Sequence, residues 1–355
     1  MLQPMRDAFM AALPEGVDML ARVANARKLL EFLAETTPDT GPYGETLRAW
    51  AKRFPNLPDD YIAHDFLEEC NNPVMVSQFA ASANQYGLGF LAECELQAMI
   101  LDNYEAKVAE GIRARGGNDL VASEQMLDWL TGRTFRQTLL VSRERMASIN
   151  RALTADSLAG LHFVLPNGAK VERDGDKTSL CLPNGRSINS GNAEVGAMLD
   201  AMVLAMPGSS AHDDLLGTAQ GETRAALSEA LYRMVITGMV QVASEADVCL
   251  NSASEKPLAS ALVRSDVEAG AATTTNLRHE PLSIDPAARI ALPMLDGETS
   301  RKAIITKLIK EAKAGKITYA KDGAEITDPA KLKVVVEEHL EGMLTNLAAA
   351  AMLEA

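Results

Sequence analysis

The sequence predicts a mostly helical α+β protein, in which an N-terminal helical domain precedes two winged-helix-like α+β units. Its 355 residues favour two or three compact domains. Hydrophobic residues make up 47% of the chain and aromatic residues only 5%, with 16 methionines, a composition typical of packed helices. Asn-Gly and Asp-Gly turns, which join short strands, occur only in the later part of the chain.

Residues 1–155 are expected to form the helical domain, because apolar residues recur there at helical spacing between Asp or Asn caps and Pro or Gly stops. The Gly-rich segment 87–92 follows a helix, so it is predicted to end that helix and not to bind a phosphate group. The expected elements are helices over 17–35, 59–70, 73–86 and around 123–130, and an extended segment over 133–142.

Residues 156–252 are expected to form a second, winged-helix-like α+β domain. Three extended runs over 161–168, 170–176 and 179–185 alternate with Asn-Gly and Asp-Gly turns and predict a β-meander. Helices over 193–206 and 222–237 and a terminal strand complete it.

Residues 253–355 repeat a winged-helix order of elements. Asp285 and Pro286 cap a helix that runs to Leu295, and a second helix covers 300–314. A hairpin with its turn at Asp322-Gly323 and a long last helix follow. We therefore expect a third domain of winged-helix type here.

The charge balance disfavours nucleic acid as a partner. Lys and Arg number 34 against 48 Asp and Glu, so the net charge is -14 and phosphate backbones are repelled. The stretch 301–333 nevertheless holds nine basic residues, a pattern shared by a DNA-reading helix with its wing and by any solvated amphipathic helix. A winged-helix DNA-binding transcription regulator is therefore the alternative function.

The remaining chemistry-bearing residues form no catalytic or metal motif. The four cysteines are far apart, which favours reduced thiols in the cytoplasm, and we expect no membrane segment. The five histidines lack metal spacing, and His212 lies in a Gly/Ser-rich segment where we expect it to be solvated. His64 and Glu68 are four residues apart on one helix face, where a plain contact is the simpler interpretation and a pair of metal ligands or a base with its carboxylate is the alternative.

Residues 61–96 (YIAHDFLEECNNPVMVSQFAASANQYGLGFLAECEL) resemble the signature of the bacterial methyltransferase regulatory domain family. That family reads as an aromatic residue, His, an acidic residue, an aromatic-Leu-Glu run and an Asn-x-Pro turn. Further similar segments lie at 133–144, 257–284 and 291–304. Val74-Met75 departs from the pattern, because the family tends to carry an aromatic pair there.

The resemblance implies an accessory or regulatory module of an S-adenosylmethionine-dependent methyltransferase, akin to the C-terminal half of protein-lysine-methyltransferase-like proteins. Such a module binds a protein substrate or the catalytic domain. The chain shows no strand that ends in an acidic-x-Gly-x-Gly loop, so we expect it to bind no cofactor, S-adenosylmethionine being held by a catalytic methyltransferase domain in cis or trans. A second copy of the chain is a further candidate partner. We assign no enzymatic activity to the chain itself.

The same resemblance, together with the polar face opposite the apolar side of helix 59–70, indicates one interaction surface. Arg133 and Arg136 could pair with the carboxylates of this polar face or stabilise the first domain internally, and both interpretations stay open. The candidate residues are His64, Asp65, Glu68, Asn72, Pro73, Arg133 and Arg136.

Overall fold

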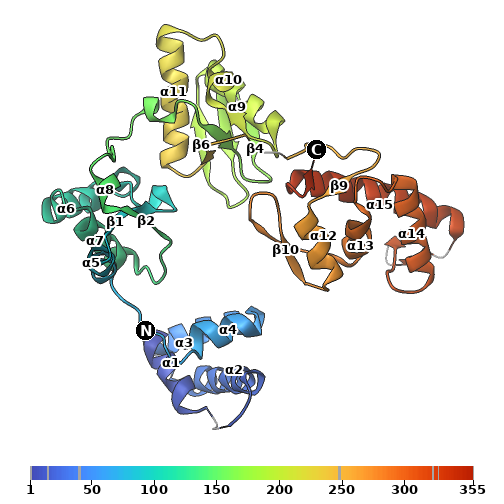
Figure 1. Ribbon diagram of the computed structural model, residues 1–355, viewed down its shortest axis with the longest axis horizontal. Helices are drawn as coiled ribbons and strands as arrows, with labels where there is room; N and C mark the ends of the chain where they lie inside the picture. The colour runs from blue at the N-terminus through green and yellow to red at the C-terminus, as the bar shows by residue number, and fades with distance from the viewer. Residues whose placement is uncertain are drawn as a thin grey trace. The chain divides into compact units, whose positions relative to one another are not determined.

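The computed structural model describes residues 2–13, 16–38, 41–246, 249–321, 324–326 and 328–354. These residues form many helices and six small antiparallel sheets of two or three strands (Figure 1), which confirms the predicted α+β class. The chain divides into two compact units, Met1–Phe79 and Ala80–Ala355, and each is described by itself. The finer division into domains 1–155, 156–252 and 253–355 stays a prediction.

The first unit is a helical bundle around a core of aromatic side chains. Asp18 accepts the backbone N–H of Ala21 at 2.8 Å and so caps the second helix. The rings of Phe9, Phe54 and Phe66 pack with centroids 5.1 to 6.5 Å apart. The helices are α1 (Leu2–Ala11), α2 (Met19–Thr36), α3 (Pro42–Arg53), the 3-10 turn Phe54–Asn56, and α4 (Asp59–Phe66).

Two predicted helix boundaries were wrong. The helix expected over 59–70 ends at Phe66, so Glu68 lies beyond it. The helix expected from Asn72-Pro73 begins instead at Val76 and forms α5 (Val76–Gln85). Gln78 accepts the backbone N–H of Met75 at 3.0 Å, which places the cap at Met75 and leaves Asn72 and Pro73 in the connecting segment.

The second unit starts with helices that flank a two-stranded antiparallel sheet. Strand β1 (Leu88–Glu93) pairs with β2 (Thr138–Ser142) from Leu88↔Ser142 to Glu93↔Thr138. Gly87, at φ +75°, does lie at the end of α5, but a strand follows it directly, so the view of 87–92 as only a helix stop was incomplete. The accompanying helices are α6 (Ala106–Gly116), α7 (Leu120–Thr131) and α8 (Arg143–Met146).

The middle segment contains a β-meander, although not the one predicted. Strands β4, β5 and β6 form it, whereas β3 lies in a different sheet between β7 and β8. His212 is buried, with 7% of its surface exposed, so the expectation that it is solvated was wrong. The elements are β3 (His162–Val164), β4 (Lys170–Asp174), β5 (Lys177–Cys181), β6 (Ser187–Ser190), α9 (Ala193–Ala205), β7 (Ser210–Ala211), α10 (His212–Leu216), α11 (Gly221–Ile236) and β8 (Gln241–Ala243).

The last segment has the expected order of helix, helix, hairpin, helix around one apolar core. Ile304, Leu308, Val336 and Leu340 are fully buried in it. The turn at Asp322-Gly323 lies outside the described residues. The elements are β9 (Leu258–Ala259), α12 (Ala261–Glu268), β10 (Thr273–Thr275), β11 (Pro281–Ser283), α13 (Pro286–Ala291), α14 (Arg301–Lys313), β12 (Ala320–Lys321), β13 (Ala324–Glu325), α15 (Pro329–Ala349) and β14 (Leu353–Glu354).

The helix expected to run from 286 to 295 is shorter than predicted. It ends at Ala291 and continues as a 3-10 turn over Leu292–Met294, since Pro293 has no N–H to donate to the α-helical ladder. In the described part of the chain, no helix is both long and apolar enough to cross a membrane.

Candidate functional site

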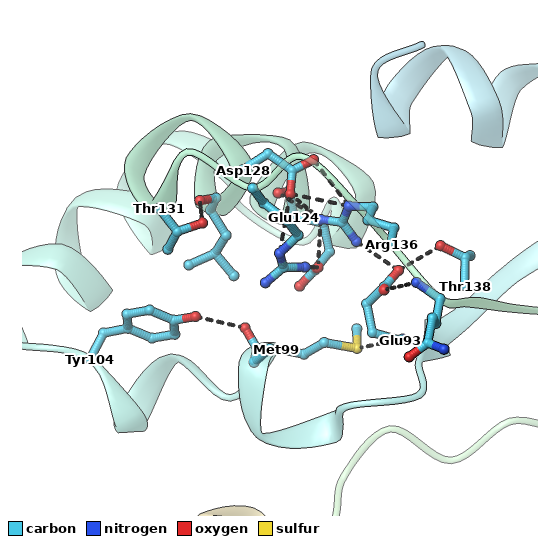
Figure 2. A network of polar contacts seen from close by, with 12 residues as sticks. Glu93, Met99, Tyr104, Glu124, Asp128, Thr131, Arg136 and Thr138 are labelled. Carbon is cyan, nitrogen blue, oxygen red and sulfur yellow. Dashed lines mark hydrogen bonds and ion pairs between the residues drawn. The ribbon is translucent and has the colours of Figure 1, made fainter. Parts of the chain in front are cut away.

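Arg136, one of the predicted site residues, lies at the centre of a charged cluster between α7 and the β1–β2 sheet. Its Nη1 donates to Glu93 Oε1 at 2.8 Å, and its Nη2 donates to Glu124 Oε2 at 3.0 Å and to Asp128 Oδ1 at 2.7 Å. Figure 2 shows the carboxylates of Glu93, Glu124 and Asp128 around the guanidinium of Arg136. We call Glu93, Glu124, Asp128, Arg133 and Arg136 the arginine cluster.

The cluster joins three elements of the second unit. Glu93 Oε2 accepts the backbone N–H of Gln137 at 3.0 Å, and its Oε1 accepts the Thr138 hydroxyl at 2.6 Å, so this side chain ties β1 to β2. Arg136 Nε lies 3.0 to 3.1 Å from both oxygens of Asp128 on α7. These are charge-assisted bonds with bidentate geometry, the strongest class of protein hydrogen bond. The cluster therefore fixes the loop between α7 and β2.

The cluster is buried and carries an excess negative charge. Only 1% of Glu124 and 5% of Glu93 is exposed. The three carboxylates face two guanidinium groups, those of Arg136 and Arg133, and the second lies 3.6 Å from both Glu124 and Asp128. Burial raises the pKa of Glu124, against the opposing effect of the Arg136 hydrogen bond. Burial alone would lower the pKa of Arg136, but its bonds to the carboxylates of Asp128, Glu93 and Glu124 outweigh that effect and raise it.

Three large apolar side chains are exposed on the segment that the cluster holds. Trp129 is 68% exposed, Leu130 60% and Phe135 77%. Asp128 and Arg136 anchor the two ends of this segment, and Gly132 turns the chain in the left-handed region at φ +62°. We call residues 129–135 the docking segment. Exposed aromatic residues on a fixed backbone are typical of protein-binding surfaces.

The other predicted site residues lie in or next to α4 in the first unit. His64 Nδ1 is 3.5 Å from Glu68 Oε2, with side chains 79% and 47% exposed, as expected for a plain contact on a solvated face. Asp65 accepts a hydrogen bond from Asn71 Nδ2 on its backbone carbonyl at 2.9 Å. Asn72 and Pro73 are exposed.

The structure thus brings His64 together with Glu68, and Arg133 together with Arg136. The two groups belong to different units, and a surface shared between them stays a prediction. The interpretation that the arginines stabilise their own domain is favoured, because Arg136 finds three carboxylate partners within its own unit.

Sequence reasoning missed Glu93, Glu124 and Asp128. The available signal was the acidic pair Glu124 and Asp128, four residues apart in a largely apolar helix, since such a pair needs cationic partners when buried. Nothing local pointed to Glu93, which reaches Arg136 across 43 residues.

The described residues contain no group of three or more His, Cys, Asp or Glu side chains arranged to hold a metal ion. Part of the basic stretch is already paired: Lys307 of α14 and Lys316, just after this helix, lie 2.7 and 2.8 Å from the two oxygens of Glu311. Hydrogen bonds from these lysines lower the pKa of Glu311 to about 2. This pairing reduces the positive charge that α14 can offer to a phosphate backbone.

Comparison with known proteins places the arginine cluster within a described domain. Residues 58–142 match the family model "Predicted methyltransferase regulatory domain", and residues 255–352 match "PKMT, C-terminal winged helix domain". These matches confirm the resemblance and the winged-helix fold of the last segment. For the middle segment, the winged-helix type stays a prediction.

Two longer proteins resemble the chain over almost all of its length. The uncharacterized protein RP789 of Rickettsia prowazekii (strain Madrid E) is 26% identical over 372 residues, and this chain spans 66% of its length. PKMT2 from Rickettsia typhi has the same fold with a TM-score of 0.82 at 22% identity, over 99% of this chain and 71% of that one. The Rickettsia typhi protein is also known in complex with AdoHcy, with the same TM-score of 0.82.

Proposed function

We propose that this chain is the regulatory and protein-binding region of an S-adenosylmethionine-dependent methyltransferase, and that the docking segment binds the catalytic domain in cis or in trans. The observation that carries the proposal is the exposure of Trp129 and Leu130 at the end of α7 and of Phe135 on the loop after it, a segment whose two ends the buried arginine cluster holds in place. Ordering a loop before binding lowers the entropic cost of association, which is the physical use of such a cluster.

The comparisons support the choice of partner. The docking segment falls inside the match to the methyltransferase regulatory domain, and the relatives are longer than this chain. One of them binds AdoHcy, the product of methyl transfer from S-adenosylmethionine. A catalytic domain is therefore the partner that best fits this surface.

The test is a titration of this chain with the S-adenosylmethionine-binding domain encoded in the same gene or beside it. Loss of a central aromatic contact typically costs about 2 kcal/mol, so Phe135→Ala should weaken binding about thirtyfold. Leu130→Ala and Leu204→Ala form a matched pair, since both leucines are exposed (60% and 82%) and only the first is in the docking segment. The proposal would be refuted if Leu130→Ala and Phe135→Ala bound the partner as tightly as Leu204→Ala does.

The cofactor is proposed to sit on the partner and not on this chain. After the turn residue Gly87, residues 88–92 belong to strand β1, which pairs with β2, so this stretch does not form a phosphate-binding loop. Calorimetry with S-adenosylmethionine and this chain alone should show no heat of binding, whereas stoichiometric micromolar binding would contradict this assignment.

The surface formed by His64, Asp65, Glu68, Asn72 and Pro73 is retained as a second protein-contact proposal, because all five residues are exposed and all but the proline are polar. Glu68→Ala should leave the melting temperature within a few degrees, since exposed substitutions usually cost under ~0.5 kcal/mol, and should weaken partner binding. A large loss of stability with unchanged affinity would assign these residues to the structure of the first unit.

A further inference from the structure

The outer edge of strand β6 is open. The β4–β5–β6 sheet ends at β6, and no other strand of the described residues pairs with it. The hairpin before it closes with the Leu182 N–H donating to the Arg186 carbonyl at 2.9 Å, and the register continues through Leu180↔Ile188 and Ser179↔Asn189. Because hydrogen-bonded and non-bonded pairs alternate, the backbone N–H and C=O groups of Ser187 and Asn189 point away from β5.

A groove of about 370 Å³ runs beside this edge. Buried Val195 and Leu199 of α9 form part of its apolar lining. Glu229 and Arg233 of α11, joined at 2.8 Å, lie at its polar side with largely exposed side chains. Figure 1 labels the three elements that contribute, β6, α9 and α11. The groove is lined by Ile188, Asn189, Ser190, Asn192, Val195, Leu199, Ala226, Glu229, Ala230, Arg233 and Met234.

We propose that this groove binds an extended, cationic peptide segment of a partner protein, which adds to the open edge of β6 as a further strand and places alternate apolar side chains in the groove. Three consecutive β6 residues line the groove, so a ligand in it lies along the strand edge, where main-chain hydrogen bonds are available. Strand addition is a common mode of peptide recognition, in which backbone bonds give affinity and pockets select alternate side chains.

The charge of the chain selects the sign of the peptide. At a net charge of -14, the chain attracts cationic segments and repels acidic ones. This proposal rests on the proposed function in that it assigns the groove to the protein substrate, but it does not depend on the docking segment. Peptide binding can be measured on this chain alone, and Phe135→Ala should leave it unchanged, so failure of one proposal is distinguishable from failure of the other.

The probe is a fluorescein-labelled synthetic peptide in which lysine and valine alternate, titrated with the full chain by fluorescence anisotropy. Asn189→Pro removes the outward N–H that the added strand needs, at an edge position that tolerates proline. Asn189→Ala removes the same side chain and keeps the N–H, so it is the matched control. We expect Asn189→Pro to bind the peptide at least about tenfold more weakly than Asn189→Ala.

Two modified peptides test the backbone geometry independently of folding. N–H groups of alternate residues point to the same edge of a strand, so N-methylation of every lysine and N-methylation of every valine block opposite edges. Strand addition predicts that one of these two peptides binds and the other does not. A peptide with glutamate in place of lysine should bind about tenfold more weakly or not at all.

Several results would overturn the proposal. They are absence of binding by the lysine–valine peptide, equal affinity of Asn189→Pro and Asn189→Ala, and equal affinity of the two N-methylated peptides. Binding lost in Ala230→Phe, which fills the groove, but kept in Asn189→Pro would mean that the groove takes side chains or small molecules without strand addition, and would also overturn it.

Discussion

Replacement of Arg136 by methionine should destabilise the second unit more than any change on its surface. Methionine keeps much of the side-chain volume but removes the hydrogen bonds to Glu93, Glu124 and Asp128. Glu124 and Glu93 are 1% and 5% exposed, and Arg133, at 3.6 Å from Glu124, is then the remaining cation of the cluster. Breaking a buried ion pair on one side typically costs about 3–5 kcal/mol, because the opposite charges are left without compensation.

Tryptophan fluorescence can report this loss locally. The chain has two tryptophans, and Trp129 lies next to Asp128 of the cluster, so a Trp50→Phe background leaves one reporter in the second unit. With a urea dependence of about 2 kcal/mol per molar, the expected loss lowers the unfolding midpoint by about 2 M. Arg133→Met is the control, since its contacts at 3.6 Å are longer, and it should lower the midpoint by less than half as much.

A midpoint for Arg136→Met that stays within about 0.3 M of the parent would refute this reasoning. It would show that the cluster contributes nothing to folding, and Arg136 would return to consideration as an interface residue.

Three further outcomes follow from buried groups. Burial raises the pKa of Glu124 above 4.5, so the folded state keeps this proton to higher pH than the unfolded chain, and stability falls as pH rises through that range. Urea midpoints measured by Trp129 fluorescence should therefore fall from weakly acidic to neutral pH in the parent chain, and this fall should be absent in Glu124→Gln. Hydrogen bonds from Lys307 and Lys316 lower the pKa of Glu311 from 4.5 to about 2, so its contribution to folding stability is full above pH 4.5 and is lost as pH falls towards 2. Acid titration followed by circular dichroism should therefore show a smaller acid-induced loss of stability in Glu311→Gln than in the parent chain. Leu308→Ala should cost about 2–5 kcal/mol in thermal unfolding, because Leu308 is fully buried, whereas Val334→Ala, at a 53% exposed position, should cost less than about 1 kcal/mol.

The parts of the fold that could be predicted from the sequence are those with local causes. Asp285 accepts the backbone N–H groups of Ala287 and Ala288 in the first turn of α13, and this helix was predicted from that cap. Pairing between distant segments was not predictable in this way. Strand β1 was missed because its partner β2 lies about 45 residues away, and β3 was assigned to the wrong sheet because its partners β7 and β8 come much later in the chain.

The candidate site shows the same limit. Arg136 was selected from the sequence, but its partners Glu93, Glu124 and Asp128 come from β1 and α7, which only the folded chain brings together. The exposure of Phe135 and Trp129 was equally out of reach, since an apolar residue in a sequence is expected to be buried by default. Whether such a side chain is a core or a surface residue depends on which neighbours cover it.

The open edge of β6 also bears on how copies of this chain behave in concentrated solution. An unpaired strand edge is a template for any extended segment, including one from an identical molecule, and proteins limit this hazard with short strands and charge. Here the strand has four residues, and at neutral pH the net charge of -14 keeps copies apart. That repulsion vanishes near the isoelectric point of about 4.9, so purification and storage well above this pH protect the chain from edge-to-edge aggregation.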